Sequence, residues 1–186
     1  MKTKIFCDSA DYKVVRKLNR NPIVSGFTTN PSLMKLAGAK SYKNYSLKLL
    51  KICNKKPISL EVFADDYKEM LKQANIIKSW GKNVYVKIPV VNSKGKYSGK
   101  VIKTLSDEGV KLNITAVYTV NQVKKIIKNI NKKSKTIISI FSGRMSDVGK
   151  DPIPIINKSV KLTKKLKNVK ILWASTREAY NYLQAK

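Results

Sequence analysis

One lysine, Lys87, lies inside an apolar run, residues 84–90, that otherwise has the composition of a buried β-strand. Ionised lysine is rarely buried without a partner, because burial strips the ammonium group of its hydration. A desolvated lysine is a candidate nucleophile, since its neutral amine can attack a carbonyl group and form a Schiff base. The alternative is an edge strand whose Lys87 side chain faces solvent, and this run alone does not separate the two.

Other chemically capable side chains stand at or near the end of almost every apolar run. The carboxylates of Asp8 and Glu61 can move protons. Arg144 and Arg177 each follow such a run, and only four of the 39 basic residues are arginines. Arginine at these places therefore suggests a bidentate phosphate clamp. The remaining positions carry amides or hydroxyls: Thr28, Thr29, Asn30, Asn113, Thr115, Ser139 and Ser175.

An amine, two carboxylates and a phosphate clamp together indicate aldol chemistry on sugar phosphates. Each residue alone has an ordinary explanation. Asp8 can cap a helix that begins near residue 11 or 12, and Glu61 can pair with a surface lysine. Asn30-Pro31-Ser32 can be only a turn and a helix cap. These explanations do not account for the joint appearance of the residues, one per strand and in this order.

Short β-branched runs alternate with amphipathic helical patterns along the chain, which is typical of parallel β/α units. Strands are predicted at residues 4–7, 23–27, 58–63, 84–90, 110–116, 135–141 and 169–174. Helices are predicted at residues 12–19, 32–37, 42–53, 66–80, 98–108, 120–131, 154–166 and 177–184. No low-complexity linker divides the chain, so we expect a single domain over residues 1–186.

Repeated β/α units form either a doubly wound sheet or a (β/α)8 TIM-type barrel. The polar residues follow seven different strands, which favours the barrel, because a doubly wound sheet concentrates its site at one switch point. No glycine-rich phosphate loop is present. Only seven strands are predicted, so the eighth β/α unit is missing from this α/β barrel sequence, and two strand edges are expected to be open.

The net charge is +28, from 39 basic and 11 acidic residues. A polyanion partner is one interpretation. Codon bias is the favoured one, because the lysines are spread along the whole chain.

The absence of histidine excludes a histidine base and most transition-metal sites. The two cysteines, Cys7 and Cys53, suggest a reducing cytoplasm, and no run is long enough to predict a membrane span.

Seven motifs resemble those of transaldolases, in particular the short members related to fructose-6-phosphate aldolase. The most specific is Thr28-Thr29-Asn30-Pro31-Ser32-Leu33. The others are residues 6–10, 59–62, 86–89, 112–115, 138–144 with Asp147, and 174–177. The resemblance covers essentially the whole chain in order. The chain departs from the family at Ile140, where proline is usual, and at Ser142, where valine is usual.

The resemblance implies a barrel enzyme that transfers a dihydroxyacetone unit from a ketose phosphate to an aldose phosphate, in the pentose phosphate pathway. Lys87 would form the Schiff base, Asp8 would assist carbon–carbon cleavage, and Glu61 would activate water. No cofactor or metal is implied, since the protonated imine is the electron sink. The implied substrate-binding residues are Thr29, Asn30, Asn113, Thr115, Ser139, Phe141, Arg144, Ser175 and Arg177.

Three other functions stay open. Simple fructose-6-phosphate aldolase activity is disfavoured by Glu61 and Phe141, where the aldolase relatives have glutamine and tyrosine. A basic nucleic-acid-binding protein lacks clustered basic residues and interleaved aromatics. An inactive truncated fragment is the third. In short members of the family the C-terminal helix packs on a neighbouring subunit, so a homo-oligomer is expected if the C-terminus is completed.

Overall fold

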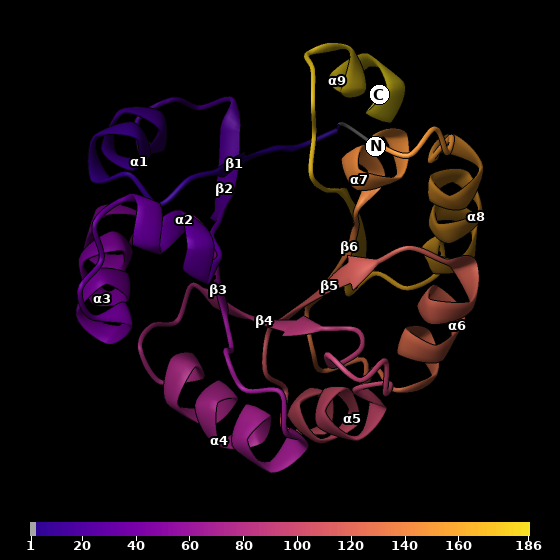
Figure 1. Ribbon diagram of the computed structural model, residues 1–186, viewed down its shortest axis with the longest axis horizontal. Helices are drawn as coiled ribbons and strands as arrows, with labels where there is room; N and C mark the ends of the chain where they lie inside the picture. The colour runs from indigo at the N-terminus through magenta and orange to yellow at the C-terminus, as the bar shows by residue number, and fades with distance from the viewer. Residues whose placement is uncertain (1–2) are drawn as a thin grey trace.

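The computed structural model describes residues 3–186. Within these residues, seven parallel strands form one sheet whose spatial order equals their order in the chain. The sheet curls into an incomplete barrel with the helices on its outer side (Figure 1). The strands are β1 (Ile5–Asp8), β2 (Val24–Thr28), β3 (Ile58–Glu61), β4 (Val84–Pro89), β5 (Leu112–Val117), β6 (Thr136–Ile140) and β7 (Val169–Trp173).

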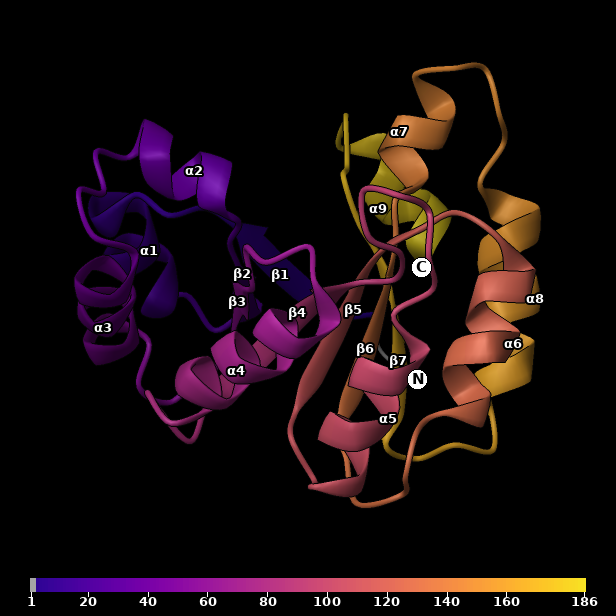
Figure 2. The same cartoon turned by 60° about the horizontal axis from the view of Figure 1, so that its bottom comes forward.

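The helices follow the strands, and most of them, such as α4, α5, α6 and α8, cover the convex face of the sheet (Figures 1 and 2). None of the helices described is both long and apolar enough to cross a bilayer. The helices are α1 (Tyr12–Asn19), α2 (Pro31–Leu36), α3 (Tyr42–Ile52), α4 (Tyr67–Lys78), α5 (Gly99–Asp107), α6 (Val120–Lys128), α7 (Ser142–Ser146), α8 (Ile153–Thr163) and α9 (Tyr180–Ala185).

The core lies between the sheet and its helices, as the alternation of side chains along a strand requires. In β4, Val84, Val86 and Ile88 are buried against the helices. One face of α4 contributes to this core, since Met70, Ala74 and Ile77 are buried there. The opposite face of each strand is left to line the inside of the curled sheet, where the polar residues lie.

The sheet is open between β1 and β7, which do not pair with each other in the part of the chain described. The segment before β1 runs across this opening towards α9 (Figure 1). There the hydroxyl of Thr3 donates to the carbonyl oxygen of Ala185 at 3.1 Å, which ties the segment before β1 to α9. The predicted barrel topology with seven strands is confirmed.

Two differences from the sequence prediction concern the last third of the chain. Helix α7 was not predicted, because five residues are too few to show a helical period. The last helix begins at Tyr180 and not at residue 177. Residues 175–177 instead form a loop in which the Arg177 side chain bonds back to Ser175.

Candidate active site

Lys87 lies on the inner face of β4, a central strand between β3 and β5. The residue is 7% exposed. Its ammonium nitrogen lies 3.2 Å from Glu61 Oε2 and donates to the carbonyl oxygen of Thr29 at 3.1 Å. The alternative of an edge strand with a solvent-facing lysine is therefore wrong. The strand register brings the partners together, because Glu61 pairs directly with Lys87 across the ladder.

Glu61 is the last residue of β3, and its surroundings have opposing effects on the pKa of its carboxyl group. Burial raises the pKa of Glu61, the neighbouring ammonium of Lys87 lowers it, and the charge of Asp8 raises it further. The net direction is upward from the ordinary value of 4.5. A carboxyl group in this condition gains and loses a proton closer to neutral pH than an exposed one does.

A chain of buried hydrogen bonds continues the site across β5 and β6. Asn113, which pairs with Lys87 in the ladder, donates from Nδ2 to Ser59 Oγ at 2.9 Å. The hydroxyl of Ser139 donates to Asn113 Oδ1 at 2.6 Å. Asn113 is thus held in a single orientation. Ser59 was not singled out in the sequence, although it lies two residues before Glu61 on the same face of β3.

Thr115, two residues after Asn113, is also buried. Its hydroxyl has no hydrogen-bond partner among the residues described. The next residue, Ala116, has a left-handed backbone with φ of 56°, and the β5–β6 register shifts at this point. Strained backbone of this kind and unpaired buried polar groups are both features that gather at functional sites.

Asp8 ends β1 and accepts a hydrogen bond from the hydroxyl of Thr28 at 2.7 Å. The helix-cap explanation of Asp8 is wrong, because Asp11 caps α1. For Asn30 the ordinary explanation holds in part. Its Oδ1 accepts from the amide of Leu33 at 2.8 Å and caps α2. Thr29 is buried, and its hydroxyl donates to the carbonyl oxygen of Ser59 at 2.9 Å.

The predicted phosphate residues lie at the ends of β6 and β7. Arg177 is exposed and bonds Asp147 in a bidentate pair, at 2.8 Å from Nε and 2.5 Å from Nη2. These bonds from Arg177 lower the pKa of Asp147. Nη1 of Arg177 also donates to Ser175 Oγ at 3.0 Å. Arg144 lies exposed on α7, close enough to Asp147 for its charge to act on that carboxylate.

Phe141, at the start of α7, packs edge to face on Tyr118 with ring centroids 5.8 Å apart.

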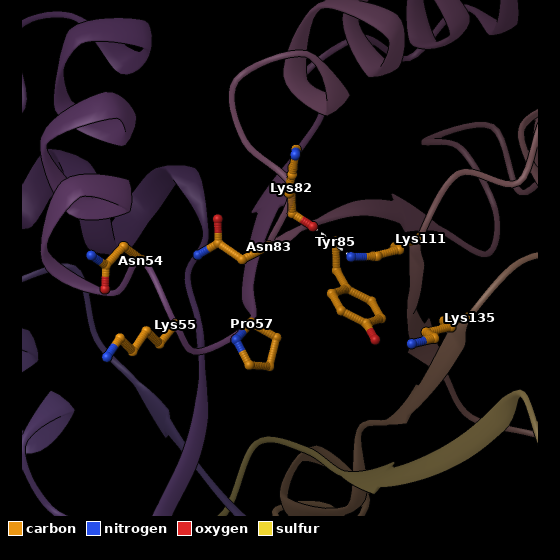
Figure 3. A pocket seen from close by; sticks show the side chains of 8 residues that line it. All are labelled: Asn54, Lys55, Pro57, Lys82, Asn83, Tyr85, Lys111 and Lys135. Atoms are coloured by element: carbon orange, nitrogen blue, oxygen red, sulfur yellow. Dashed lines mark hydrogen bonds between the residues drawn. The ribbon is translucent and has the colours of Figure 1, made fainter.

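A hollow of about 280 Å³ lies at the opposite, amino ends of β3 to β6 (Figure 3). It contains none of the predicted site residues. Its lining is Asn54, Lys55, Pro57, Lys82, Asn83, Tyr85, Lys111 and Lys135. The predicted residues instead gather at the carboxyl ends of the strands, where barrel enzymes carry their sites.

The sequence profile of the Transaldolase/Fructose-6-phosphate aldolase family matches residues 5–186. The chain belongs to this family. A "Probable transaldolase" of Herpetosiphon aurantiacus is 32% identical over 183 residues, which are 98% of this chain and 78% of that protein. Another of the same name, from Dehalococcoides mccartyi, is 34% identical over 183 residues, 98% of this chain and 81% of that protein.

The fold of this transaldolase-family chain is also similar to that of a solved dihydrodipicolinate synthase from Rhodopseudomonas palustris. The TM-score is 0.57 at 13% identity, over 92% of this chain. The chain spans 65% of the length of that protein. At this identity the similarity concerns the fold alone, and it supports the barrel-type architecture. Family membership places the chain among enzymes of transaldolase and aldolase type, as the motifs predicted.

Proposed function

We propose that the protein is a transaldolase that moves a dihydroxyacetone unit between sugar phosphates through a Schiff base on Lys87. The observation that carries the proposal is the buried ammonium of Lys87, 3.2 Å from a carboxylate on the inner face of the sheet. A lysine in such a place can lose its proton to a neighbouring base and attack a ketone. The family match supports the same chemistry.

The proposed reaction begins with attack of the Lys87 amine on the ketone carbon of a ketose phosphate, which forms a carbinolamine. Loss of water then leaves a protonated imine. Asp8 accepts the proton of the hydroxyl on the β carbon, two bonds from the imine carbon. The bond between the α and β carbons breaks, and its electron pair moves into the imine to form an enamine. An aldose phosphate leaves. The enamine attacks the carbonyl carbon of a second aldose phosphate, whose oxygen takes the proton back from Asp8. Hydrolysis of the new imine then frees Lys87 and the product.

Glu61 is proposed to exchange protons with the water that leaves and re-enters the imine. Its raised pKa supports this role, because a group that both donates and accepts works best when its pKa lies near the working pH. The carboxylate also lies beside Lys87 Nζ, the atom that must lose and regain protons.

The hydroxyl and amide groups on the inner face are proposed to hold the covalent intermediate. Thr115 supports this proposal most directly, since its buried hydroxyl is unpaired among the described residues and a substrate hydroxyl would satisfy it. Thr29, Asn30, Asn113 and Ser139 complete the set.

Arg144, Ser175 and Arg177 are proposed to bind the phosphate group of the substrate. The support is that Arg177 is already held in a fixed direction by Asp147 and Ser175. A guanidinium group fixed in this way loses little entropy when a phosphate binds to the N–H group that these bonds leave over.

Transfer is proposed over simple aldol cleavage because of Glu61 and Phe141. The side chain of Phe141 has no hydroxyl and packs on Tyr118, so it offers no proton to a free enamine. Steady release of dihydroxyacetone from fructose 6-phosphate without an acceptor would instead indicate an aldolase. A transaldolase stalls after one turnover under these conditions.

The test of the Schiff base is borohydride trapping in the presence of fructose 6-phosphate. We expect a three-carbon adduct on Lys87, found by peptide mass mapping, and no adduct in Lys87→Met. The matched control is Lys56→Met, because Lys56 is likewise held by a carbonyl oxygen, that of Asn21 at 2.8 Å, but lies away from the site. The control should retain full trapping. An adduct on another lysine would refute the proposal.

The pentose phosphate pathway and the cytoplasm are proposed as the setting. Both cysteines of the chain, Cys7 and Cys53, are free thiols, which supports a reducing compartment. We also propose a single domain over residues 1–186, because one connected cluster of buried apolar side chains extends from Ala10 to Val169. Homo-oligomer formation stays a prediction.

A further inference from the structure

Strand β2 leaves the sheet just before the site. Its last hydrogen bond to β3 runs from the amide of Thr29 to the carbonyl oxygen of Ser59, at 3.2 Å. The chain then turns at Asn30 into α2. β3 continues for two more residues and ends at Glu61, whose backbone has lost its neighbour on that side. A buried strand end of this kind must find other partners for its N–H and C=O groups.

In a regular parallel ladder the next bond would run from the amide of Glu61 to the carbonyl oxygen of Thr29, because the bonds alternate at every second residue. The structure has a different arrangement. The amide of Glu61 donates to the phenolic oxygen of Tyr42 at 2.8 Å, and the same hydroxyl donates to the carbonyl oxygen of Glu61 at 2.8 Å. The Thr29 carbonyl oxygen accepts from Lys87 Nζ instead.

We propose that Tyr42 is a positioning residue for both Glu61 and Lys87. Its hydroxyl takes the place of β2 along the Glu61 backbone and so leaves the Thr29 carbonyl oxygen free to hold the Lys87 ammonium group. The proposal rests on the proposed function, in which Lys87 and Glu61 do the chemistry.

The ring of Tyr42 is itself held in a fixed place on α3. Phe63 packs on it edge to face with centroids 4.4 Å apart, and Trp80 lies at 5.9 Å with a 55° tilt. Burial raises the pKa of Tyr42, so its hydroxyl keeps the proton that it donates. The hydroxyl can therefore be removed without loss of the aromatic contacts.

The test variant is Tyr42→Phe. Without the hydroxyl, the Glu61 amide is expected to turn to the Thr29 carbonyl oxygen and to compete with Lys87 for that acceptor, which weakens the hold on the ammonium group. We expect the rate of borohydride trapping and kcat to fall about tenfold, the usual effect of an unsatisfied buried group. KM for the acceptor aldose phosphate should stay within about twofold, because no acceptor contact is removed. The acid limb of the pH–rate profile, which reports the titration of Glu61, should shift in this variant as well.

The matched control is Tyr45→Phe, three residues further along the same helix. The Tyr45 hydroxyl is hydrogen-bonded to the carbonyl oxygens of Ala10 and Ala37, at 3.0 and 3.1 Å, and among the described residues it has no hydrogen bond to a strand. Its loss should lower Tm comparably but leave the trapping rate and the pH profile unchanged. If both variants slow trapping equally, the effect is merely structural and the proposal fails.

Should Tyr42→Phe fail to fold, Phe63→Leu is the second variant. Phe63 is half exposed, so its replacement is tolerated, but the contact that fixes the Tyr42 ring is lost. We expect a smaller loss of trapping rate, about threefold. Unchanged trapping would overturn the proposal. Absence of a Lys87 adduct in the unsubstituted protein would instead refute the proposed function, so the two failures are distinguishable.

Discussion

The carboxylate of Glu61 shows how burial on the inner face of the sheet changes the pKa of an ionisable group. Glu61 has an ammonium group 3.2 Å away, yet its pKa is raised, because desolvation outweighs the attraction of Lys87 and Asp8 adds a like charge. The pair is therefore not a simple stabilising salt bridge. In buried ion pairs the cost of desolvation commonly cancels the gain from attraction. The value of this pair lies in a proton that can move near the working pH.

The raised pKa of Glu61 predicts how the rate of the reaction depends on pH. The acid limb of the trapping-rate profile should lie above pH 4.5, the ordinary value for this group, and it should be absent in Glu61→Gln, with a rate loss of about 100-fold. The control is Glu108→Gln, which removes an exposed carboxylate paired with Lys78 at 2.7 Å. Its profile should match that of the parent. An unchanged limb in Glu61→Gln would contradict the assignment.

The same group has a predicted effect on stability. A carboxyl whose pKa is higher in the folded than in the unfolded state makes unfolding easier as the pH rises from about 4.5 towards the raised value. The Tm of Glu61→Gln relative to the parent should therefore increase over this window when measured by calorimetry. A relative Tm that falls over the window would contradict the raised pKa.

At the level of elements, the contact between α7 and the end of β7 positions the proposed phosphate residues. A Cβ atom on Gly143 would lie 1.6 Å from the carbonyl oxygen of Ser175, a backbone atom that cannot move aside cheaply. Glycine is therefore required there for close approach. The bidentate pair of Arg177 with Asp147 joins the same two segments a second time.

Gly143→Ala should push the Ser175 loop away from α7. We expect a loss of about 1–3 kcal/mol in the free energy of unfolding, typical of overpacking, and a rise of about tenfold in KM for sugar phosphates. The control is Ser146→Ala, which removes only the hydroxyl bond to the carbonyl oxygen of Ser142 within α7. Denaturant titration and initial rates measure both effects. Unchanged KM in Gly143→Ala would argue against the phosphate role of this loop.

For the whole molecule, the open curl of the sheet makes stability uneven. β4 and β5 have neighbours on both sides, whereas β1 and β7 each have one sheet partner within residues 3–186. Edge strands offer unpaired backbone groups and open more readily. The site residues Lys87 and Asn113 lie on the central strands, and Asp8 lies on an edge.

Amide hydrogen exchange should follow this order. Amides of β4 and β5 should exchange at least about tenfold more slowly than those of β1 and β7, because local opening requires less energy at the edges. Exchange measured peptide by peptide in the 186-residue chain checks this. Equal protection of all seven strands would mean that the edges are covered, for example by a second copy of the chain.

The pattern of the sequence determined the order of strands and helices, since apolar periodicity depends only on neighbouring residues. It also marked Lys87, Glu61 and Asn113, whose polarity is out of place in apolar runs. It left two explanations open for Asp8, and it could not find helix α7, which is too short for a period.

Only the tertiary structure decided how the residues meet. The bond from Lys87 to Thr29 spans 58 residues, and that from Asn113 to Ser59 spans 54. Such bonds depend on strand register and on where one strand stops beside another, which local sequence patterns do not contain. Tyr42 is the clearest case. Its sequence position indicates an ordinary helix residue, and only the early departure of β2 from the sheet makes its hydroxyl a partner of Glu61.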